Sequence, residues 1–155
     1  MAMCRTKGDL TAVVLDLPEV TKLTTEYVAA EGMSERVTTL DGNYHDADFG
    51  EGFDLVFFSA IVHINSPDEN EALMRKAFAA LNPGGCIAIQ DFVMAEDRLS
   101  PASSAMFALN MIVSTRAGDT YTKGEMSGWL MDAGCAETTF HQTGPTTAVV
   151  SGRKA

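Results

Sequence analysis

Apolar and polar positions follow one another along the chain in runs that predict strands separated by helices. The β-branched run at residues 11–15 is typical of a buried strand, and residues 36–40 form a second candidate. Between them, apolar side chains recur at helical spacing from Pro18 to about Ala30, which predicts a helix. The apolar run at residues 53–59 predicts a third strand, buried on both faces.

A fourth strand and the helix before it are framed by strong local signals. Ser66, Pro67 and Glu69 match a capping box with proline at the first helical position, and the predicted helix runs to about Leu81. The Asn-Pro-Gly-Gly segment at 82–85 stops it. Residues 86–90 then predict the fourth strand, which residues 91–93 extend.

The last third of the chain predicts two helices and a hairpin. Ser100 and Pro101 open a helix that is apolar nearly all round between residues 105 and 113, so we expect it to be buried or to cover a pocket. A second capping box begins a helix that ends at Gly134: it consists of Thr122 and Glu125. Two strands follow, at 137–142 and 146–152, joined at Gly144-Pro145.

This order of elements predicts an α/β fold with a mostly parallel sheet and an antiparallel C-terminal hairpin. The chain has no internal repeat or linker, so we expect a single domain over residues 1–155. Its net charge of −10 and scattered basic residues argue against a nucleic-acid partner. No run approaches the roughly 18 apolar residues of a membrane span. Three widely spaced cysteines and no recognisable signal peptide favour a cytoplasmic location.

Polar side chains follow the predicted strands where each strand ends. They are Asp16 after the first strand, Asp41 to Tyr44 after the second, Ser59 and His63 after the third, and Asp91 after the fourth. In open α/β sheets, ligands bind beyond the carboxyl ends of the strands, so this arrangement predicts a cofactor cleft.

Each of these residues also has a structural interpretation. Asp16 sits where an acidic residue often begins a helix, and Gly42-Asn43 is compatible with an ordinary turn. A single histidine in a loop such as His63 is often structural. Its alternative role is that of a general base, because an imidazole titrates near pH ~6.5 and can take a proton from a phenol. The three histidines and the cysteines do not have metal-ligand spacing, so we predict no metal site.

Taken in order, several short motifs resemble those of the class I, S-adenosylmethionine-dependent O-methyltransferases that act on small molecules, including plant phenolic, bacterial polyketide and hydroxyindole enzymes. They are Asp16-Leu17-Pro18-Glu19-Val20, Gly42-Asn43-Tyr44, Phe53-Asp54-Leu55-Val56, His63, Leu81-Asn82-Pro83-Gly84-Gly85, Asp91-Phe92-Val93 and Gly118-Asp119-Thr120-Tyr121-Thr122. The resemblance covers about residues 10–153 and implies a Rossmann-like methyltransferase sheet with S-adenosylmethionine as cofactor.

The resemblance implies a role for each strand end. Asp16 would bind the ribose hydroxyls of the cofactor and Leu17 would pack on its adenine. Gly42, Asn43 and Tyr44 would complete the adenine site, where Asn43 replaces the usual acid, and we add Ser59 to this cofactor-binding set. His63 would be the catalytic base and Asp91 would orient it. The position of a second family acid falls near Thr120, which is not ionisable.

The resemblance also implies an acceptor pocket along the apolar helix. Met106, Phe107, Asn110 and Met111 would line it, although ordinary core packing would explain the same pattern. The family's first strand and glycine-rich loop have no counterpart in residues 1–10, and that strand would lie between residues 11–15 and 53–59. A fragment of a longer protein, a strand from another chain, or a degenerate fold would each account for this.

Two functional hypotheses follow from the sequence. The first is an O-methyltransferase, or a fragment of one, that methylates a hydroxyl of a small aromatic or polyketide-like acceptor and forms a homodimer. The second is a non-catalytic, methyltransferase-like module that oligomerises through its exposed sheet, since unpaired strand edges favour association.

Overall fold

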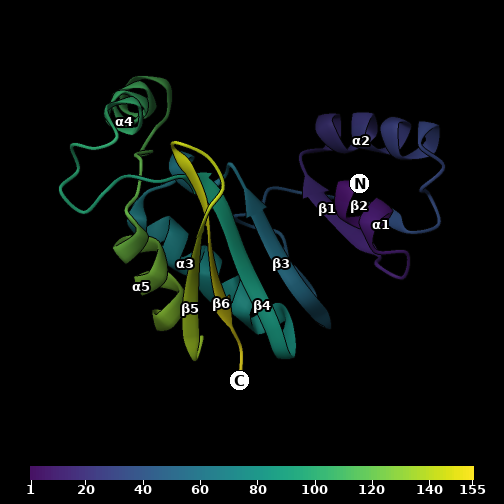
Figure 1. Ribbon diagram of the computed structural model, residues 1–155. Coiled ribbons are helices and arrows are strands. Elements are labelled where there is room, and N and C mark those ends of the chain that lie inside the picture. Colours follow the sequence, from purple (N-terminus) through teal and green to yellow (C-terminus); the bar gives the residue numbers. More distant parts are fainter. The chain divides into compact units, whose positions relative to one another are not determined.

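The computed structural model describes residues 1–155, which form two compact units, residues 1–48 and residues 49–155. The first unit is coloured purple to blue in Figure 1, and the second runs from teal to yellow. Each unit contains its own sheet, and no strand pairing joins the two sheets. The prediction of a single domain over residues 1–155 is not tested by this division and stays a prediction.

The first unit is a two-stranded parallel sheet with two helices. Its elements are α1 (Ala2–Thr6), β1 (Ala12–Asp16), α2 (Pro18–Ala30) and β2 (Val37–Asp41). Cys4, Val28, Met33 and Val37 form its buried core. β1 and β2 pair in register with Asp16 opposite Asp41, so the ends of both strands reach the same edge of the sheet. The strands and the helix predicted for this region are therefore confirmed.

The second unit is a four-stranded mixed sheet with helices. Its elements are β3 (Phe53–Ser59), the 3-10 turn η1 (Val62–Ile64), α3 (Pro67–Ala80), β4 (Leu81–Phe92), α4 (Ala102–Ser114), α5 (Lys123–Asp132), β5 (Glu137–Gln142) and β6 (Thr147–Arg153). The strand order is β3-β4-β6-β5. β3 and β4 are parallel, whereas β6 is antiparallel to both β4 and β5. The predicted α/β class with an antiparallel C-terminal hairpin is confirmed.

Both predicted capping boxes are formed. In α3 the Ser66 hydroxyl accepts the Glu69 N–H while the Glu69 carboxylate accepts the Ser66 N–H, and Thr122 and Glu125 do the same for α5. Each box satisfies two backbone groups that a helix start leaves unpaired. α3 and α5 pack on each other and on the sheet. The boxes therefore fix where the two helices of the core begin.

The fourth strand starts earlier than predicted. The segment expected to be a turn after the helix, residues 82–85, lies inside β4, which begins at Leu81. Leu81 pairs with Phe53, and the register then shifts before Leu55 pairs with Cys86. The glycine and proline residues therefore produce an irregularity in a continuous strand, because tertiary pairing with β3 overrides their local turn preference.

The prediction that β3 is buried on both faces is wrong. Leu55 and Phe57 are 40% and 41% exposed, although Phe58 is buried. β3 is an edge strand that pairs only with β4, and an edge strand has a neighbour on one side alone. β1, expected to be buried, likewise leaves Val13 48% exposed. The apolar composition of these strands predicts that they contact a core. It does not predict how much of each strand its neighbours bury.

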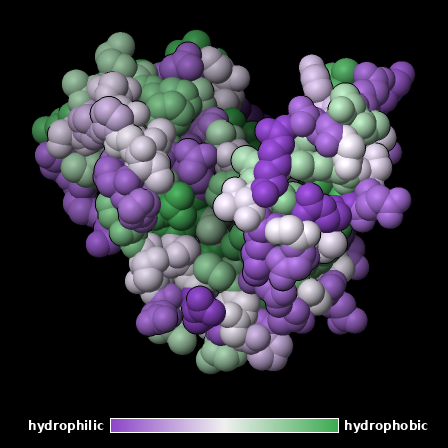
Figure 2. All heavy atoms as spheres, turned by 45° about the vertical axis from the view of Figure 1, so that its right-hand side comes forward, coloured by the Kyte–Doolittle hydropathy of each residue, from purple (hydrophilic) through white to green (hydrophobic).

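For the apolar helix, predicted to be buried or to cover a pocket, the first alternative is wrong. In α4 only Ser104, Ala108 and Met111 are buried, at i, i+4 and i+7 positions of one face. The outward side chains of the helix are exposed: Met106, Leu109, Ile112 and Val113. Figure 2 shows hydrophobic residues, in green, among hydrophilic ones on the displayed face of the molecule. No helix of the structure is both long enough and apolar enough to cross a membrane.

Candidate active site

The site that the structure assembles most fully surrounds His63, in the loop after β3. The chain leaves Ser59, passes through Ala60 at φ +57° and enters η1. The Ala60 N–H donates to the Gln90 carbonyl at 2.9 Å, and the Ser59 hydroxyl donates to the Gln90 side-chain oxygen at the same distance. A non-glycine residue with positive φ is strained and is frequent at functional sites.

His63 and Asp91 form a hydrogen-bonded pair. His63 Nδ1 lies 2.7 Å from Asp91 Oδ1, and the Asp91 side chain is completely buried while that of His63 keeps 13% of its exposure. The carboxylate also accepts the backbone N–H of Phe92 at 2.7 Å and, more weakly, that of His63 at 3.4 Å. Because a carboxylate can only accept, Nδ1 donates in this bond, and in the neutral tautomer that fits it Nε2 presents its lone pair.

Buried amides hold the η1 turn from the α3 side. Asn70 donates from its side chain to the Val62 carbonyl at 2.9 Å and accepts a bond from the Asn65 side chain at 3.1 Å. Both asparagines are buried. Buried polar groups need hydrogen-bond partners. The two asparagines supply partners to each other and to a backbone carbonyl of the turn, and these bonds fix the backbone that carries His63.

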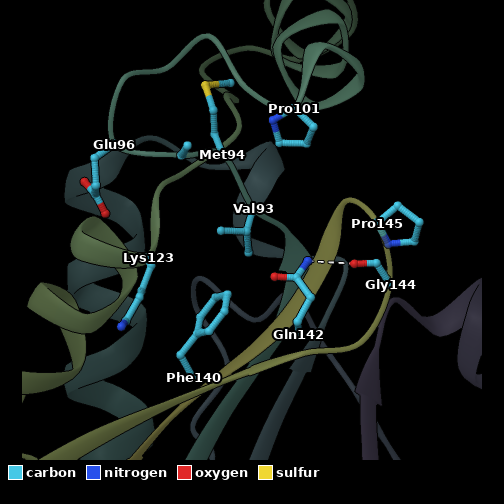
Figure 3. Close-up of a pocket in the computed structure, with 10 residues that line it drawn as sticks. Val93, Met94, Glu96, Pro101, Lys123, Phe140, Gln142, Gly144 and Pro145 are labelled. Carbon is cyan, nitrogen blue, oxygen red and sulfur yellow. Dashed lines mark hydrogen bonds between the residues drawn. The ribbon is translucent and has the colours of Figure 1, made fainter.

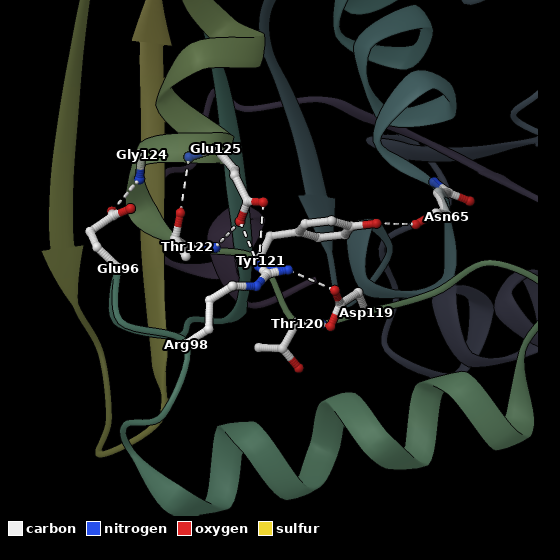
Figure 4. Close-up of polar contacts among 9 residues, drawn as sticks. All are labelled: Asn65, Glu96, Arg98, Asp119, Thr120, Tyr121, Thr122, Gly124 and Glu125. Carbon is white, nitrogen blue, oxygen red and sulfur yellow. Dashed lines mark hydrogen bonds and ion pairs between the residues drawn. The ribbon is translucent and has the colours of Figure 1, made fainter.

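The segment before α5 holds the same turn from the other side (Figure 4). The Asp119 N–H donates to the His63 carbonyl at 3.0 Å, and the Tyr121 hydroxyl donates to the Asn65 carbonyl at 2.5 Å. Burial, and after it the negative charges of Asp119 and Glu125, raise the pKa of Tyr121 well above its ordinary value. The phenol therefore stays protonated and keeps donating its hydrogen bond.

Arg98 forms ion pairs with two carboxylates of this segment. Arg98 contacts the Asp119 carboxylate at 2.7 Å and that of Glu125 at 3.2 Å, as the dashed lines of Figure 4 mark. Burial opposes the charge of Arg98, but the hydrogen bond to Asp119 and the charge of Glu125 outweigh it and raise the pKa of the guanidinium. Arg98 therefore links the loop before α4 to the segment that fastens the His63 turn.

Two aromatic rings form an apolar wall at His63. The Phe107 ring meets the imidazole edge to face, with centroids 5.1 Å apart, and the Phe92 ring stacks on Phe107 at 4.1 Å. Such contacts fix ring orientation in addition to burying area. Of the four predicted acceptor residues, Phe107 therefore lies against the histidine. Met111 is buried, whereas Met106 and Asn110 are exposed on α4.

The predicted cofactor residues of the first unit lie together at the ends of β1 and β2. Asp16 Oδ1 accepts the Leu17 N–H at 2.8 Å, and the Asp16 carbonyl accepts the Gly42 N–H at 2.9 Å. The Leu17 side chain is 43% exposed. The N-cap of α2 is Leu17 and no side chain caps the helix, so Asp16 makes only this bond to its neighbour, and its second carboxylate oxygen remains for a ligand.

Asn43 and Tyr44 belong to the turn that follows. The Asn43 side-chain oxygen accepts the His45 N–H at 3.0 Å, so it stabilises the turn, although an amide oxygen can accept a second bond. The Tyr44 ring lies 4.4 Å from that of His45. A Cβ on Gly42 would come within 3.0 Å of the Ala47 Cβ, which makes this position tight. Ser59, the remaining predicted cofactor residue, belongs to the second unit.

Four residues of the His63 site were given no role from the sequence: Phe92 and Tyr121, which appeared only as members of the quoted motifs, and Asn65 and Asn70. Asn70 carried a usable signal, because it lies on the same helical face as the apolar Leu73 and Ala77, where a polar side chain must be buried with a partner. The motif around Tyr121 gave no indication of its hydrogen bond, since its partner Asn65 is 56 residues away in the chain.

A cavity in the second unit lies away from His63, near the β5–β6 hairpin (Figure 3). It encloses about 520 Å³ and contains none of the predicted site residues. Its lining consists of Val93, Met94, Ala95, Glu96, Pro101, Lys123, Phe140, Gln142, Gly144 and Pro145. This cavity has no hydrogen-bonded acid–base pair comparable to His63 and Asp91, so the candidate active site is at His63. No group of three or more potential metal ligands exists, and the three cysteines are unpaired.

The chain resembles O-methyltransferases over most of its length. A family model described as an O-methyltransferase domain matches residues 2–136. The chain is 34% identical over 135 residues to 3-hydroxy-5-methyl-1-naphthoate 3-O-methyltransferase of Streptomyces sahachiroi, which covers 87% of this chain and 39% of that enzyme. It is 29% identical over 144 residues to acetylserotonin O-methyltransferase of Gallus gallus, which covers 93% and 41%. The chain thus spans about two fifths of the length of these relatives.

Solved structures agree with the sequence relatives. An O-methyltransferase family protein from Burkholderia thailandensis superposes with a TM-score of 0.89 at 27% identity, over 98% of this chain and 46% of that one. Human N-acetylserotonin methyltransferase in complex with SAM has a TM-score of 0.83 at 24% identity, over 98% and 43%, and shares the fold. From its matched residues and its fold, the chain belongs to the O-methyltransferase domain family.

Proposed function

We propose that this chain supplies the catalytic region of an S-adenosylmethionine-dependent O-methyltransferase. Its acceptor is a hydroxyl group on a small aromatic or polyketide-like molecule. The observation that carries this proposal is the hydrogen bond of 2.7 Å between His63 Nδ1 and the buried Asp91 carboxylate. It leaves Nε2 as the basic nitrogen of a ring whose side chain keeps 13% of its exposure.

The chemistry assigned to this pair is proton removal. His63 Nε2 takes the proton of the acceptor hydroxyl, which makes the oxygen a stronger nucleophile, and the imidazolium that forms is stabilised by the Asp91 carboxylate. The Phe92–Phe107 wall fits a flat, apolar acceptor beside the base. The names of the Streptomyces and Gallus relatives, which act on a naphthoate and on acetylserotonin, support an aromatic acceptor.

The residues of the first unit fit the adenosine part of the cofactor. The free oxygen of Asp16 can accept hydrogen bonds from ribose hydroxyls, and Asn43 can accept one more bond at the adjacent strand end. Leu17 offers an exposed apolar side chain for the adenine and Tyr44 an aromatic one. When bound, S-adenosylmethionine supplies an electrophilic methyl group carried on a sulfonium.

Two measurements test this function. Titration of the purified chain with S-adenosylhomocysteine in a calorimeter should give a saturable heat, and no heat at millimolar ligand would remove the proposal for this chain. His63→Ala should lower methyl transfer to a panel of phenols and naphthols by about 10²–10⁴-fold, because the general base is lost. Its affinity for S-adenosylhomocysteine should change by less than about twofold.

His141→Ala is the matched control for this experiment. His141 lies on β5 and is exposed, so its loss should leave methyl transfer unchanged. Turnover of His63→Ala equal to that of His141→Ala would remove His63 from the role of base.

A second candidate function is supported by the exposed apolar side chains of β3. The proposed homodimer, or a non-catalytic module that associates through its sheet, would cover Leu55 and Phe57 on this edge strand. Sedimentation of the chain at micromolar concentration tests it. A dimer that Phe57→Asp converts into a monomer supports this association, and a monomeric wild type would exclude it.

A further inference from the structure

Thr120 carries the only buried side-chain polar atom in the structure that has no hydrogen-bond partner. Its side chain is completely buried, and no protein group lies within hydrogen-bonding distance of Oγ1. Nearly all buried polar groups in proteins are paired, because an unpaired one loses its bonds to water without replacement. A valine, which has the same shape without the hydroxyl, would avoid this cost. The hydroxyl therefore has no stabilising role inside the folded chain.

The position of Thr120 is fixed between two anchors on the His63 turn. The residue before it donates its backbone N–H to the His63 carbonyl, and the residue after it donates its phenol to the Asn65 carbonyl. The backbone of Gly118 also lies close to the turn, since a Cβ there would be 2.2 Å from the His63 carbonyl oxygen. Thr120 thus belongs to a segment that is locked against the turn carrying the proposed base.

The hydroxyl and the imidazole face the same helix. In Figure 4 the Tyr121 ring extends toward Asn65, while the Thr120 side chain points away from it toward α4. The His63 ring also meets α4, through its edge contact with Phe107. Both side chains therefore face α4, and the bond of 3.0 Å from the Asp119 N–H to the His63 carbonyl keeps the backbones that carry them next to each other.

We propose that Thr120 is an acceptor-positioning residue, whose hydroxyl binds a second oxygen of the acceptor next to the hydroxyl that His63 deprotonates. This inference rests on the proposed methyl-transfer function and refines its substrate class. The Thr120 hydroxyl can donate to a ketone or carboxylate oxygen, or accept from a hydroxyl. The preferred acceptor is a phenol or naphthol with an oxygen substituent beside the reacting hydroxyl. Because Thr120 is completely buried, such an acceptor reaches the hydroxyl only when the side chains that cover it move aside.

A matched pair of acceptors tests this role in a binding measurement. 1-Naphthol and 2-acetyl-1-naphthol differ only in a ketone next to the hydroxyl. Thr120→Val should weaken binding of the ketone-bearing compound by about 3- to 10-fold and change that of 1-naphthol by less than twofold, since one neutral hydrogen bond is lost. Thr120→Ser, which keeps the hydroxyl, should bind the ketone-bearing compound as strongly relative to 1-naphthol as the wild type does. Calorimetric titration of the full chain measures all six dissociation constants, those of wild type and the two variants for each compound.

Thermal unfolding supplies an independent readout. Removing an unpaired buried hydroxyl should raise the Tm of Thr120→Val by about 2–4 °C. A lower Tm, or equal loss of binding for the two naphthols, would show a structural role and overturn the inference, as would failure of both naphthols to bind at millimolar concentration.

The proposed function can fail separately. If the wild type binds the ketone-bearing naphthol in a Thr120-dependent way but transfers no methyl group, then methyl transfer by this chain is excluded while the subsite stands. If methyl transfer proceeds and Thr120→Val discriminates the two naphthols no differently from wild type, the subsite alone is excluded.

Discussion

The turn that carries His63 and the helix α4 meet at one aromatic contact, yet they are held in opposite ways. The turn is only three residues long, and the backbone around it is bound by Asp91, Asn70, Asp119 and Tyr121. α4 has 13 residues and buries only three of them. Four of its large apolar side chains are more than half exposed: Met106, Leu109, Ile112 and Val113.

This difference separates two tasks. A general base must be held within hydrogen-bond reach of one proton, so its backbone is fastened by buried polar bonds that tolerate little displacement. A wall that contacts an acceptor needs shape and apolar surface, which a helix resting on one face supplies while it can still shift. Mutations in the turn should therefore be severe, and mutations on the outer face of α4 should be mild.

The largest effect is expected at Gly118. A Cβ there would lie 2.2 Å from the His63 carbonyl oxygen and 2.6 Å from Thr115 Oγ1, so Gly118→Ala must push the segment away from the turn. We expect a loss of about 3 kcal/mol in the free energy of unfolding, measured by urea titration. Methyl transfer should fall with it, since His63 moves.

Gly128→Ala is the control for Gly118→Ala. Gly128 lies in α5 with nothing within 4 Å of the added Cβ, so alanine should stabilise the helix by roughly 0.5–1 kcal/mol. Equal destabilisation of the two variants would mean that close approach to the turn is not the cause.

An intermediate effect is expected at Tyr121. Tyr121→Phe removes the hydrogen bond to the Asn65 carbonyl and should lower the free energy of unfolding by about 1–2 kcal/mol. Tyr27→Phe, at a side chain that is 65% exposed, should have no measurable effect. If Tyr121→Phe is as stable as Tyr27→Phe, the hydrogen bond from Tyr121 to the Asn65 carbonyl does not stabilise the turn.

The same substitution should change the dependence of stability on pH. The pKa of Tyr121 is raised in the folded protein, mainly by burial, so the folded state keeps the proton at pH values where the unfolded chain releases it. This contribution is fully present below the unfolded pKa of about 10 and is lost as pH rises above that value. Stability measured from pH 9 to 11 should therefore fall less steeply in Tyr121→Phe than in wild type. Equal slopes of unfolding free energy against pH in the two proteins would contradict a raised pKa of Tyr121.

The smallest effect is expected on the outer face of α4. Val113 is 86% exposed, so Val113→Ser should change the free energy of unfolding by less than about 0.5 kcal/mol. A loss above about 1 kcal/mol in urea titration would mean that this face is covered in solution, and the contrast with the turn would then be weaker than the structure indicates.

The local parts of the fold were predictable because their signals lie within a few residues. Ser66 with Glu69 and Thr122 with Glu125 each form a capping box three residues apart, and both boxes are present. The burial of β3 and of α4 was not predictable from composition. Leu55 and Val113 are apolar, but their exposure depends on what lies across from them.

In the candidate site too, the sequence singled out some residues, and only the structure shows the contacts between them. The order of the strand ends singled out His63 and Asp91 because parallel strands bring their carboxyl ends to one edge. That the two side chains share a 2.7 Å hydrogen bond is a property of the tertiary structure. Asn70 and Tyr121 reach the turn from α3 and from the segment before α5, and no local spacing encodes their distances to it.

The sequence by itself determined the order of elements, the α/β class, the helix starts and the positions at which chemistry could lie, since each follows from periodicity and short-range hydrogen bonding. Tertiary structure alone decided which apolar faces are covered, which nitrogen of His63 is left basic, and that Thr120 is buried with its hydroxyl unpaired. These features depend on contacts between residues distant in the chain, and burial and partnership exist only after the chain has folded.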